Sequence, residues 1–478
     1  MPFRAEYNCC KSYGCPNCGK PELSLYSRSD RLGYDSWHCP LCGAYPPVLF
    51  NTPILALSEQ IYLEKSSALK MPACHCQSPY WMLNGKTSGG SQRIKCKTCK
   101  LSATLPNANR LSQNLQPLMD ALVEGVMPQQ LQEYCNLENK RFGQLVSQLS
   151  QILDCVSWYW EAGQQFTSIE TRSYVQSCRS GYRHLDRKHQ SAHAWTLITA
   201  DTTTGYVILI SDNALFDTSK LATEVEKQSL YQMPQREVGY EQTSDVLQKA
   251  KFTYDKILNR SQFDQLAYCS SLHSKLRDAL LLRPVYAAHS HMQNLHTSLL
   301  YRPPSHMFLE HESLLRGATI TAFSEEVKAG KTDLYYLHTT KRSNADRVQH
   351  QSKKSEKVIS WWSERWQRLE FESESGKWDV GIGYLTETDS DAPNPVAQFS
   401  NSHPGMVSAF WEQYGFWLPQ GYAERLSISR VHMWQNIYRY LYNMVFADIP
   451  RIELPKELSP GKIKSLIDYI NQAQLQSH

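Results

Sequence analysis

The sequence has no run of apolar residues that approaches the roughly 18 to 20 needed for a membrane-spanning helix. Its first residues lack the apolar core of a secretory signal, which disfavours export. Charge of one sign is not in large excess, because 50 Lys and Arg face 46 Asp and Glu. From these absences we expect a cytoplasmic protein that makes no contact with a membrane.

The chain is long enough, and apolar enough, to bury more than one core. It has 478 residues, of which 41% are hydrophobic, and this length suits about three domains. Basic residues concentrate near its start, where positions 1–110 hold 13 Lys and Arg against 6 Asp and Glu. A basic segment on a nearly neutral body is consistent with a surface for polyanions and also with an ordinary solvated face.

Cysteine is concentrated in the same segment. Ten of the 14 cysteines precede residue 100. Eight of these form four knuckles of two cysteines each, and the knuckles come in two pairs, separated by 20 residues in the first pair and by 19 in the second. Four thiolates complete a tetrahedral Zn²⁺ site, and two turns joined by a hairpin of this length bring them together as a zinc ribbon. Structural disulfides are the weaker explanation in an intracellular chain. The predicted zinc ligands are Cys15, Cys18, Cys39 and Cys42 in the first ribbon, and Cys74, Cys76, Cys96 and Cys99 in the second.

Other residues leave these ligand sets open. His75 can replace a thiolate in the second ribbon, where Cys74 and Cys76 are one residue closer than in the usual knuckle. Cys9 and Cys10 are alternative ligands for the first ribbon, although their place near the start of the chain also suits spare thiols.

The second ribbon carries a basic sequence around its metal site. The turn Asn84-Gly85 is followed, at residues 89–100, by GGSQRIKCKTCK. A knuckle, an Asn-Gly hairpin and Gly-x-Gln-Arg before a basic second knuckle resemble the N-terminal zinc ribbon of bacterial insertion-sequence transposases. The resemblance implies binding of double-stranded DNA through phosphate contacts. The residues expected to make these contacts are Arg93, Lys95, Lys97 and Lys100.

Helical periodicity follows the ribbons. Apolar residues recur at helical spacing over residues 111–124, 128–134 and 139–161. Three helices with a short middle one are typical of a helix-turn-helix, whose last helix enters the DNA major groove, and equally of a helical spacer. We interpret residues 106–165 as a helical DNA-binding segment that follows two zinc ribbons in residues 1–105.

The centre of the chain predicts a mixed sheet. Trp195–Asp201 and Tyr206–Ser211 alternate as the two strands of a hairpin, which places Asp201 at the end of the first strand. Residues 306–338 then predict a strand, a helix and a second strand, joined as a right-handed parallel crossover. A hairpin and a crossover that both carry acids resemble the RNase H-like catalytic domain of DDE transposases. The fold class is therefore α/β, with an RNase H-like mixed-sheet domain in residues 166–447.

The resemblance implies three acidic ligands for two Mg²⁺ or Mn²⁺ ions, which activate the attacking oxygen and stabilise the leaving one. Asp201 and Glu312 match the first two acids, and Glu310 is an alternative to Glu312 on the same strand face. Glu424 matches the third, because it opens a predicted helix that closes on an aromatic residue followed by Asn. Rivals for the third acid are Glu364 and Glu370.

Two further segments complete the predicted organisation. Residues at about 340–420 are interpreted as an insertion in the mixed-sheet domain, and residues 448–478 as a C-terminal helical tail. The resemblance implies a transposase that cleaves DNA at element ends, transfers the strands and acts as a homo-oligomer on DNA. The family has Asp at the second acid position, where this chain has Glu312. The alternatives are therefore a transposase-derived DNA-binding protein that no longer cleaves, such as a regulator or defence factor, and a structural interaction module.

Overall fold

Two compact units divide the chain, Met1–Gln60 with Gln165–Trp411 and Ile61–Gln164 with Glu412–His478. The computed structural model describes residues 3–66, 76, 80–105, 107–183, 189–219, 221, 245–258, 276–299, 302–341, 355–359, 364–373, 376–386, 406–446, 454 and 458–476. The units interleave along the sequence, so the segment predicted as the first ribbon belongs to the larger unit and the segment predicted as the second ribbon to the smaller one. Both segments keep these names below. Two helices cross the boundaries, α1 (Asn51–Ser66) and α11 (Met406–Trp417). In the described part of the chain, no helix combines the length and apolarity needed to cross a membrane.

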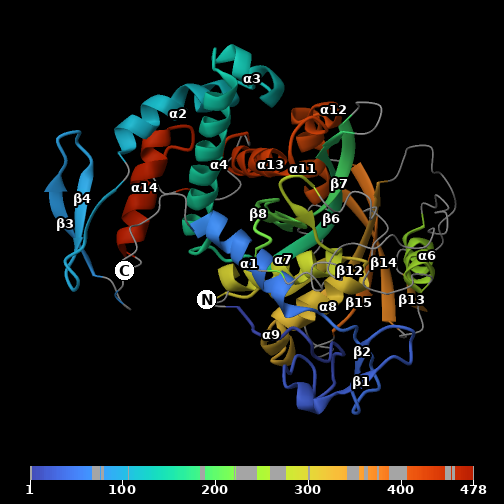
Figure 1. Ribbon diagram of the computed structural model, residues 1–478. Coiled ribbons are helices and arrows are strands. Elements are labelled where there is room, and N and C mark those ends of the chain that lie inside the picture. The colour runs from blue at the N-terminus through green and yellow to red at the C-terminus, as the bar shows by residue number, and fades with distance from the viewer. Residues whose placement is uncertain are drawn as a thin grey trace. The chain divides into compact units, whose positions relative to one another are not determined.

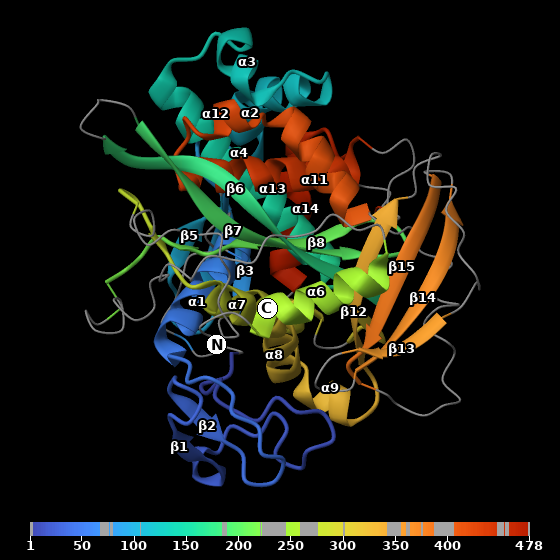
Figure 2. The same ribbon diagram turned by 90° about the vertical axis from the view of Figure 1, so that its right-hand side faces the viewer.

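An eight-stranded mixed sheet forms the centre of the larger unit (Figures 1 and 2). Its strand order is β13-β14-β15-β12-β11-β6-β7-β8. β11 runs parallel to both β6 and β12, and all other neighbours are antiparallel. The strands are β6 (Ser168–Arg183), β7 (His189–Asp201), β8 (Val207–Asp212), β11 (His306–Glu310), β12 (Asp333–Lys341), β13 (Ser355–Ile359), β14 (Glu364–Ser373) and β15 (Gly376–Tyr384).

The predicted hairpin and crossover are both confirmed as local units. The hairpin is formed by β7 and β8, and Gly205 closes its turn with a φ of +71° that favours glycine. The crossover runs from β11 through α8 (Ser313–Ala322) and α9 (Ser324–Lys328) to β12. β6 has no counterpart among the predicted strands. It pairs with both β7 and β11, so it joins the hairpin and the crossover into one sheet.

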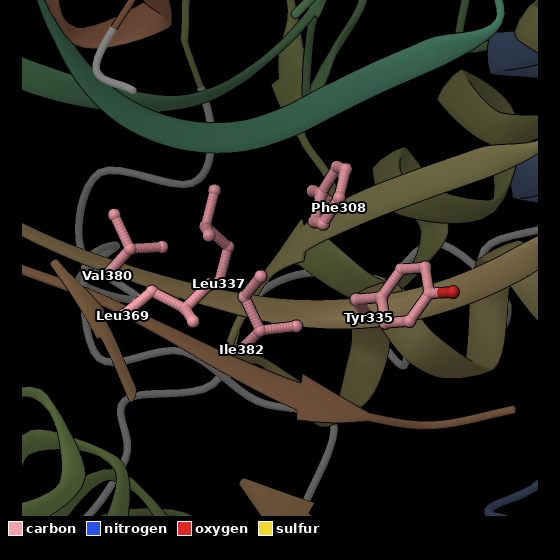
Figure 3. Packing of buried hydrophobic residues seen from close by; sticks show 6 residues of the cluster. All are labelled: Phe308, Tyr335, Leu337, Leu369, Val380 and Ile382. Atoms are coloured by element: carbon pink, nitrogen blue, oxygen red, sulfur yellow. The ribbon is translucent and has the colours of Figure 1, made fainter. Parts of the chain in front are cut away.

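The segment predicted as an insertion adds strands to this sheet. β15 pairs with β12, and β14 and β13 continue the sheet beyond it. Side chains of these strands share one buried cluster with β11 and β12 (Figure 3). Burying each such side chain stabilises the fold by roughly 1.5 to 3 kcal/mol. The cluster consists of Phe308, Tyr335, Leu337, Leu369, Val380 and Ile382.

Helices α6 (Val246–Leu258) and α7 (Pro284–Leu299) cover the opposite face of the sheet from this cluster. His291 Nε2 of α7 lies 2.8 Å from Thr199 Oγ1 of β7, and Trp366 Nε1 of β14 donates to Tyr254 OH of α6 at 3.2 Å. Figure 2 shows α6 lying over β12 to β15. Gly383 gives Trp366 its place on this face, because a Cβ at that glycine would lie 2.5 Å from the indole ring.

Short elements complete the larger unit. The first ribbon contains η1 (Leu23–Leu25) and the antiparallel strands β1 (Ser27–Ser29) and β2 (Ser36–His38). A second short pair joins β9 (Ala214–Leu215) to β10 (Leu280–Leu281). Gln60 of α1 secures this pair, because its amide donates to the Ala214 carbonyl at 3.0 Å and accepts from Phe216 N at 2.9 Å.

The smaller unit joins the second ribbon to a group of helices (Figure 1). The predicted helices are present as α2, α3 and α4, and the predicted helical tail as α14. α13 packs against α4, and α14 packs against both α2 and α4. The elements are β3 (Trp81–Lys86), β4 (Gln92–Cys96), β5 (Ser102–Thr104), α2 (Ala108–Val123), α3 (Pro128–Tyr134), α4 (Asn139–Glu161), α12 (Gln420–Ala423), α13 (Ile428–Met444) and α14 (Ile463–Gln476).

Candidate metal sites and carboxylate cluster

Four thiols of the first ribbon converge on one point. The sulfur atoms of Cys10, Cys15, Cys39 and Cys42 lie within 4.8 Å of one another. Cys10 Sγ is 3.5 Å from Cys42 Sγ, and Cys15 Sγ is 3.8 Å from Cys39 Sγ. Four sulfur ligands around one centre suit tetrahedral Zn²⁺. The group could therefore hold a metal such as zinc.

The structure differs from the sequence expectation in one ligand, because Cys10 takes the place expected for Cys18. The backbones of Cys10 and Cys18 form an isolated parallel bridge, and Gly19 N donates to the Cys10 carbonyl at 2.8 Å. This pairing brings Cys10 to the knuckle, so of the two alternative ligands expected from the sequence, Cys9 and Cys10, the second belongs to the group. Cys18 is buried and lies outside this group of four sulfurs.

The second knuckle of this ribbon favours a thiolate. Burial raises the pKa of Cys39, but hydrogen bonds from the backbone N–H groups of Cys42 and Leu41 outweigh burial and lower the pKa to about 7. The thiolate is the form that binds a metal. Backbone N–H groups of the turn therefore prepare Cys39 for a cation.

Three thiols of the second ribbon also converge. The sulfurs of Cys76, Cys96 and Cys99 lie within 4.8 Å of one another, and Cys76 Sγ is 4.0 Å from Cys96 Sγ. Cys96 ends β4, and the turn behind it closes with Lys100 at a φ of +64°. Cys74 and His75 lie outside the described residues. These three thiols could hold a metal such as zinc together with a fourth ligand.

The four predicted phosphate contacts lie on β4 and in the turn that follows it, in the same segment as Cys96 and Cys99. Arg93 and Lys95 lie on β4, next to Cys96, and Arg93 is exposed. Lys97 Nζ lies 5.4 Å from the centre of the Tyr80 ring, and Lys100 Nζ donates to the Lys97 carbonyl at 2.7 Å. Lys97 and Lys100 are exposed in the turn. The ribbon thus presents several cations beside one metal-ligating group.

The predicted first acid, Asp201, closes the β7–β8 turn. Its Oδ2 accepts hydrogen bonds from Thr204 N at 2.7 Å, Thr204 Oγ1 at 2.8 Å and Thr203 N at 3.2 Å. Burial raises the pKa of Asp201, although the bonds from Thr204 and Thr203 act against it. These bonds give the Asp201 carboxylate a structural role, which is to stabilise the turn.

The strand register separates Asp201 from the predicted second acid. Asp201 pairs with Ile169 at the start of β6, and Ile169 pairs with Met307 at the start of β11. Glu312 follows the far end of β11 and lies five residues beyond Met307, which is roughly 16 Å at about 3.3 Å per strand residue. The structure therefore does not bring Asp201 and Glu312 together, because Asp201 lies level with the start of β11 and Glu312 lies beyond its end.

An acid that the sequence analysis missed, Glu170, lies on β6 beside β11. Glu170 is 2% exposed, and its carboxylate accepts a hydrogen bond from Arg172 Nε. Arg172 Nη2 also donates to Thr339 Oγ1 of β12 at 3.0 Å. On β11, Glu310 accepts hydrogen bonds from Ser173 N at 2.7 Å and from Ser173 Oγ. β6 and β11 thus carry two carboxylates, of which Glu170 accepts from Arg172 and Glu310 accepts from Ser173.

The charges of this carboxylate cluster, Glu170, Glu310 and Arg172, influence one another. Burial raises the pKa of Glu310, and the negative charge of Glu312 raises it further. Burial lowers the pKa of Arg172, but attraction to Glu170, Tyr174 and Glu310 and the hydrogen bond to Glu170 together outweigh burial and raise it. The guanidinium therefore stays charged and neutralises part of the cluster. The alternation of β-branched residues around Glu170 was the signal in the sequence that could have revealed β6.

The remaining candidate acids lie in separate surroundings. Glu312 is 7% exposed and occupies the N-cap position of α8. Glu364 accepts a hydrogen bond from Tyr254 OH and lies 3.4 Å from Arg316 Nη1, whereas Glu370 is exposed on β14. These contacts hold Glu364 in place without a metal ion.

Glu424 does not open a helix, contrary to expectation. It is the C-cap of α12, it accepts from Gln420 Nε2 at 3.0 Å, and the next helix begins at Ile428 after Ser427. Glu424 belongs to the smaller unit, whereas Asp201 and Glu312 belong to the larger one. The local turn at 424–427 ends one helix before the next begins, and helical periodicity alone did not resolve this break.

The carboxylates predicted to hold Mg²⁺ or Mn²⁺ do not fit that role as a set. Two divalent cations need carboxylates from separate elements that converge on a shared centre. In the part of the chain that the structure describes, the two cysteine groups are the groups of three or more metal-ligating side chains with donor atoms within 4.8 Å. The predicted carboxylates do not converge because Asp201 is separated from Glu312 along β11. The two cysteine groups suit zinc.

Comparison with models of known protein families gives no match, and comparison with curated proteins gives no significant match. The arrangement of the chain's own residues is therefore the basis for any functional conclusion.

Proposed function

We propose that the protein binds double-stranded DNA through its smaller unit, in the manner of a transposase or a transposase-derived protein. The observation that carries the proposal is a set of cations on β4 and in the turn after it, the same short segment that supplies Cys96 and Cys99 to the three-thiol group. These cations are Arg93, Lys95, Lys97 and Lys100. Exposed cations on a small rigid element neutralise successive phosphates and release counterions from DNA. A metal bound by the thiols would hold β4 and its following turn in one geometry.

The larger unit also supports a transposase or a transposase-derived protein. Its sheet begins with the antiparallel strands β8, β7 and β6 and continues through parallel β11 and β12. A hairpin joined to a parallel crossover is the pattern from which the resemblance to an RNase H-like domain was inferred. We therefore propose an RNase H-like body, with the described strands β13 to β15 as an addition at one edge of its sheet.

The first experiment measures binding of a mixed-sequence DNA duplex by fluorescence anisotropy over a range of salt concentrations. Replacing Lys97 and Lys100 by Gln is expected to weaken binding uniformly across sequences and to reduce the salt slope by about two. The control replaces two exposed lysines of the larger unit, Lys251→Gln with Lys331→Gln, and is expected to leave the slope unchanged. Equal slopes in both double variants, or a wild-type protein that does not bind duplexes at low salt, would contradict the proposal.

Strand cleavage and transfer is a second candidate function, favoured by the position of Glu170 and Glu310 on adjacent parallel strands. Divalent ions supply a metal-bound nucleophile and charge neutralisation to such reactions when carboxylates hold them. In the structure the carboxylate of Glu170 accepts a hydrogen bond from Arg172, and that of Glu310 accepts one from Ser173. Because both carboxylates already have partners within the protein, we favour DNA binding without cleavage.

A plasmid assay distinguishes the two candidates. Supercoiled DNA is incubated with the protein and Mg²⁺ or Mn²⁺, and Glu170→Gln and Glu310→Gln are compared with Asp201→Asn at matched DNA binding. We expect no metal-dependent nicking by any of these proteins. Nicking by the wild type that is lost in Glu170→Gln and kept in Asp201→Asn would instead establish cleavage at the carboxylate cluster.

A further inference from the structure

A cavity of about 870 Å³ lies within the smaller unit, between the ribbon and two of its helices. The turn between β3 and β4 contributes Thr87 and Ser91, α2 contributes Arg110, and α4 contributes Arg141 and Gln148. Figure 1 shows these elements, which come from one compact unit. The volume falls within the range of roughly 300 to 1,000 Å³ that is usual for ligand sites.

The lining of this cavity suits an anion. Two guanidinium groups, of Arg110 and Arg141, stand among amide and hydroxyl side chains, and the described lining residues include no Asp or Glu. Both arginines are exposed. A guanidinium presents a planar set of donors that matches the oxygens of a phosphate group. The chemistry therefore selects a phosphate-containing ligand over a neutral or cationic one.

Hydrogen bonds hold the walls of the cavity together. Asn107, the N-cap of α2, donates to the Gly89 carbonyl at 2.8 Å and accepts from Arg110 N at 3.1 Å. Ser91 N donates to Thr87 Oγ1 at 3.0 Å and thereby fixes the turn between the strands. The ribbon turn and the start of α2 are thus joined through a single side chain. These two walls of the cavity are therefore held together by bonds within the protein itself.

We propose that this cavity holds a segment of sugar-phosphate backbone of double-stranded DNA, with Arg110 and Arg141 on its phosphates. The inference rests on the proposed function and adds a second contact region, distinct from the cations around Cys96. The cavity exceeds the size of one phosphate group, so it has room for the adjoining sugar. Ribbon and helices would then contact the same DNA molecule, and α2 and α4 would be part of the DNA-binding surface.

The test uses the full-length protein and the salt dependence of its binding to a mixed-sequence duplex. Arg110→Gln and Arg141→Gln are each expected to reduce the salt slope by about one, and the double variant by about two. Arg141→Lys keeps the charge and is expected to retain the slope while binding more weakly, because Lys lacks the planar donor set. Lys464→Gln, an exposed cation on α14 outside the cavity, is the control and is expected to behave as wild type.

Three other results would overturn the inference, and they are distinguishable. Wild-type binding with unchanged slopes in both arginine variants would remove the cavity contact and leave the proposed function standing. A wild-type protein that does not bind DNA would remove both. Protection of the wild type, but not of the double variant, from thermal unfolding by pyrophosphate at matched ionic strength, with DNA binding unchanged, would identify a site for a free phosphate compound. Unchanged circular dichroism of each variant controls for misfolding.

Discussion

Replacing Cys10 by Ser is expected to lower the zinc content of the purified protein by one ion per chain, whereas replacing Cys18 by Ser is expected to leave it unchanged. The reason is the position of the sulfurs, because Cys10 and not Cys18 lies within 4.8 Å of the other three thiols. Structural zinc contributes an apparent binding free energy of about 10 to 16 kcal/mol in small domains. The change at Cys10 should therefore also unfold the first ribbon.

Loss of the ribbon should extend into the larger unit. Arg4 donates to the carbonyls of Gly19 and Thr321 and lies 3.3 Å from Ser324 Oγ, so it links the ribbon to α8 and α9. Gly19 itself lies against Ser324, where a Cβ would come within 2.2 Å of the serine side chain. Unfolding the ribbon removes these contacts, and we expect a lower thermal midpoint in Cys10→Ser as well as less zinc.

Zinc is measured by atomic absorption after removal of loosely bound metal, and unfolding by circular dichroism. Cys135→Ser is the matched control, because Cys135 belongs to neither cysteine group. Zinc lost from Cys18→Ser and retained by Cys10→Ser would show that the ligand set expected from sequence spacing is the correct one. Zinc retained by both variants would indicate that the first group holds no zinc.

Replacing Arg439 by Met is expected to destabilise the smaller unit by about 3 to 5 kcal/mol, because it leaves buried carboxylates without their counter-charge. Arg439 of α13 is 1% exposed and bonds to two acids of α4, to Asp154 Oδ1 at 2.8 Å and to Glu161 Oε1 at 2.7 Å. The acids are themselves 4% and 1% exposed. Methionine fills part of the space but supplies neither the charge nor the hydrogen bonds.

A second cation nearby offsets part of the destabilisation caused by Arg439→Met. Lys65 of α1 is 5% exposed, and burial together with repulsion by Arg439 lowers its pKa. When Arg439 is removed, the repulsion disappears and Lys65 binds its proton more strongly, which offsets part of the loss. The destabilisation should therefore be larger at a pH above the usual pKa of lysine than at neutral pH, because there Lys65 no longer supplies the charge.

Equilibrium unfolding in urea measures this effect on the full-length protein. Arg425→Met removes an exposed arginine of the same unit and is expected to change stability by less than about 0.5 kcal/mol. Adding Asp154→Asn and Glu161→Gln to Arg439→Met should restore part of the lost stability, because the buried charges are then gone. A midpoint for Arg439→Met equal to that of Arg425→Met would mean that the ion pairs contribute nothing.

Local features of the sequence determined most elements correctly. Paired cysteines identified two metal-ligating groups, and apolar residues at helical spacing identified α2, α3 and α4. The turn expected at Asn84-Gly85 is wrong, because both residues lie within β3 at a shift in its register and the hairpin turns at residues 87–91. Alternation and a Gly205 turn identified β7 and β8. These elements depend on residues a few positions apart, so periodicity and turn chemistry suffice to predict them.

The tertiary structure alone decided which of these residues meet. Cys10 joined the first cysteine group through a backbone pairing with Cys18, and Glu170 came beside Glu310 because β6 pairs with β11 across more than 130 residues of sequence. The same register placed Asp201 level with the start of β11 and Glu312 beyond its end. Local pattern determines that a segment is a strand, but its partner and register follow from burial of side chains over the whole sheet. For this protein the elements were therefore readable from the sequence, whereas the membership of each site was a property of the fold.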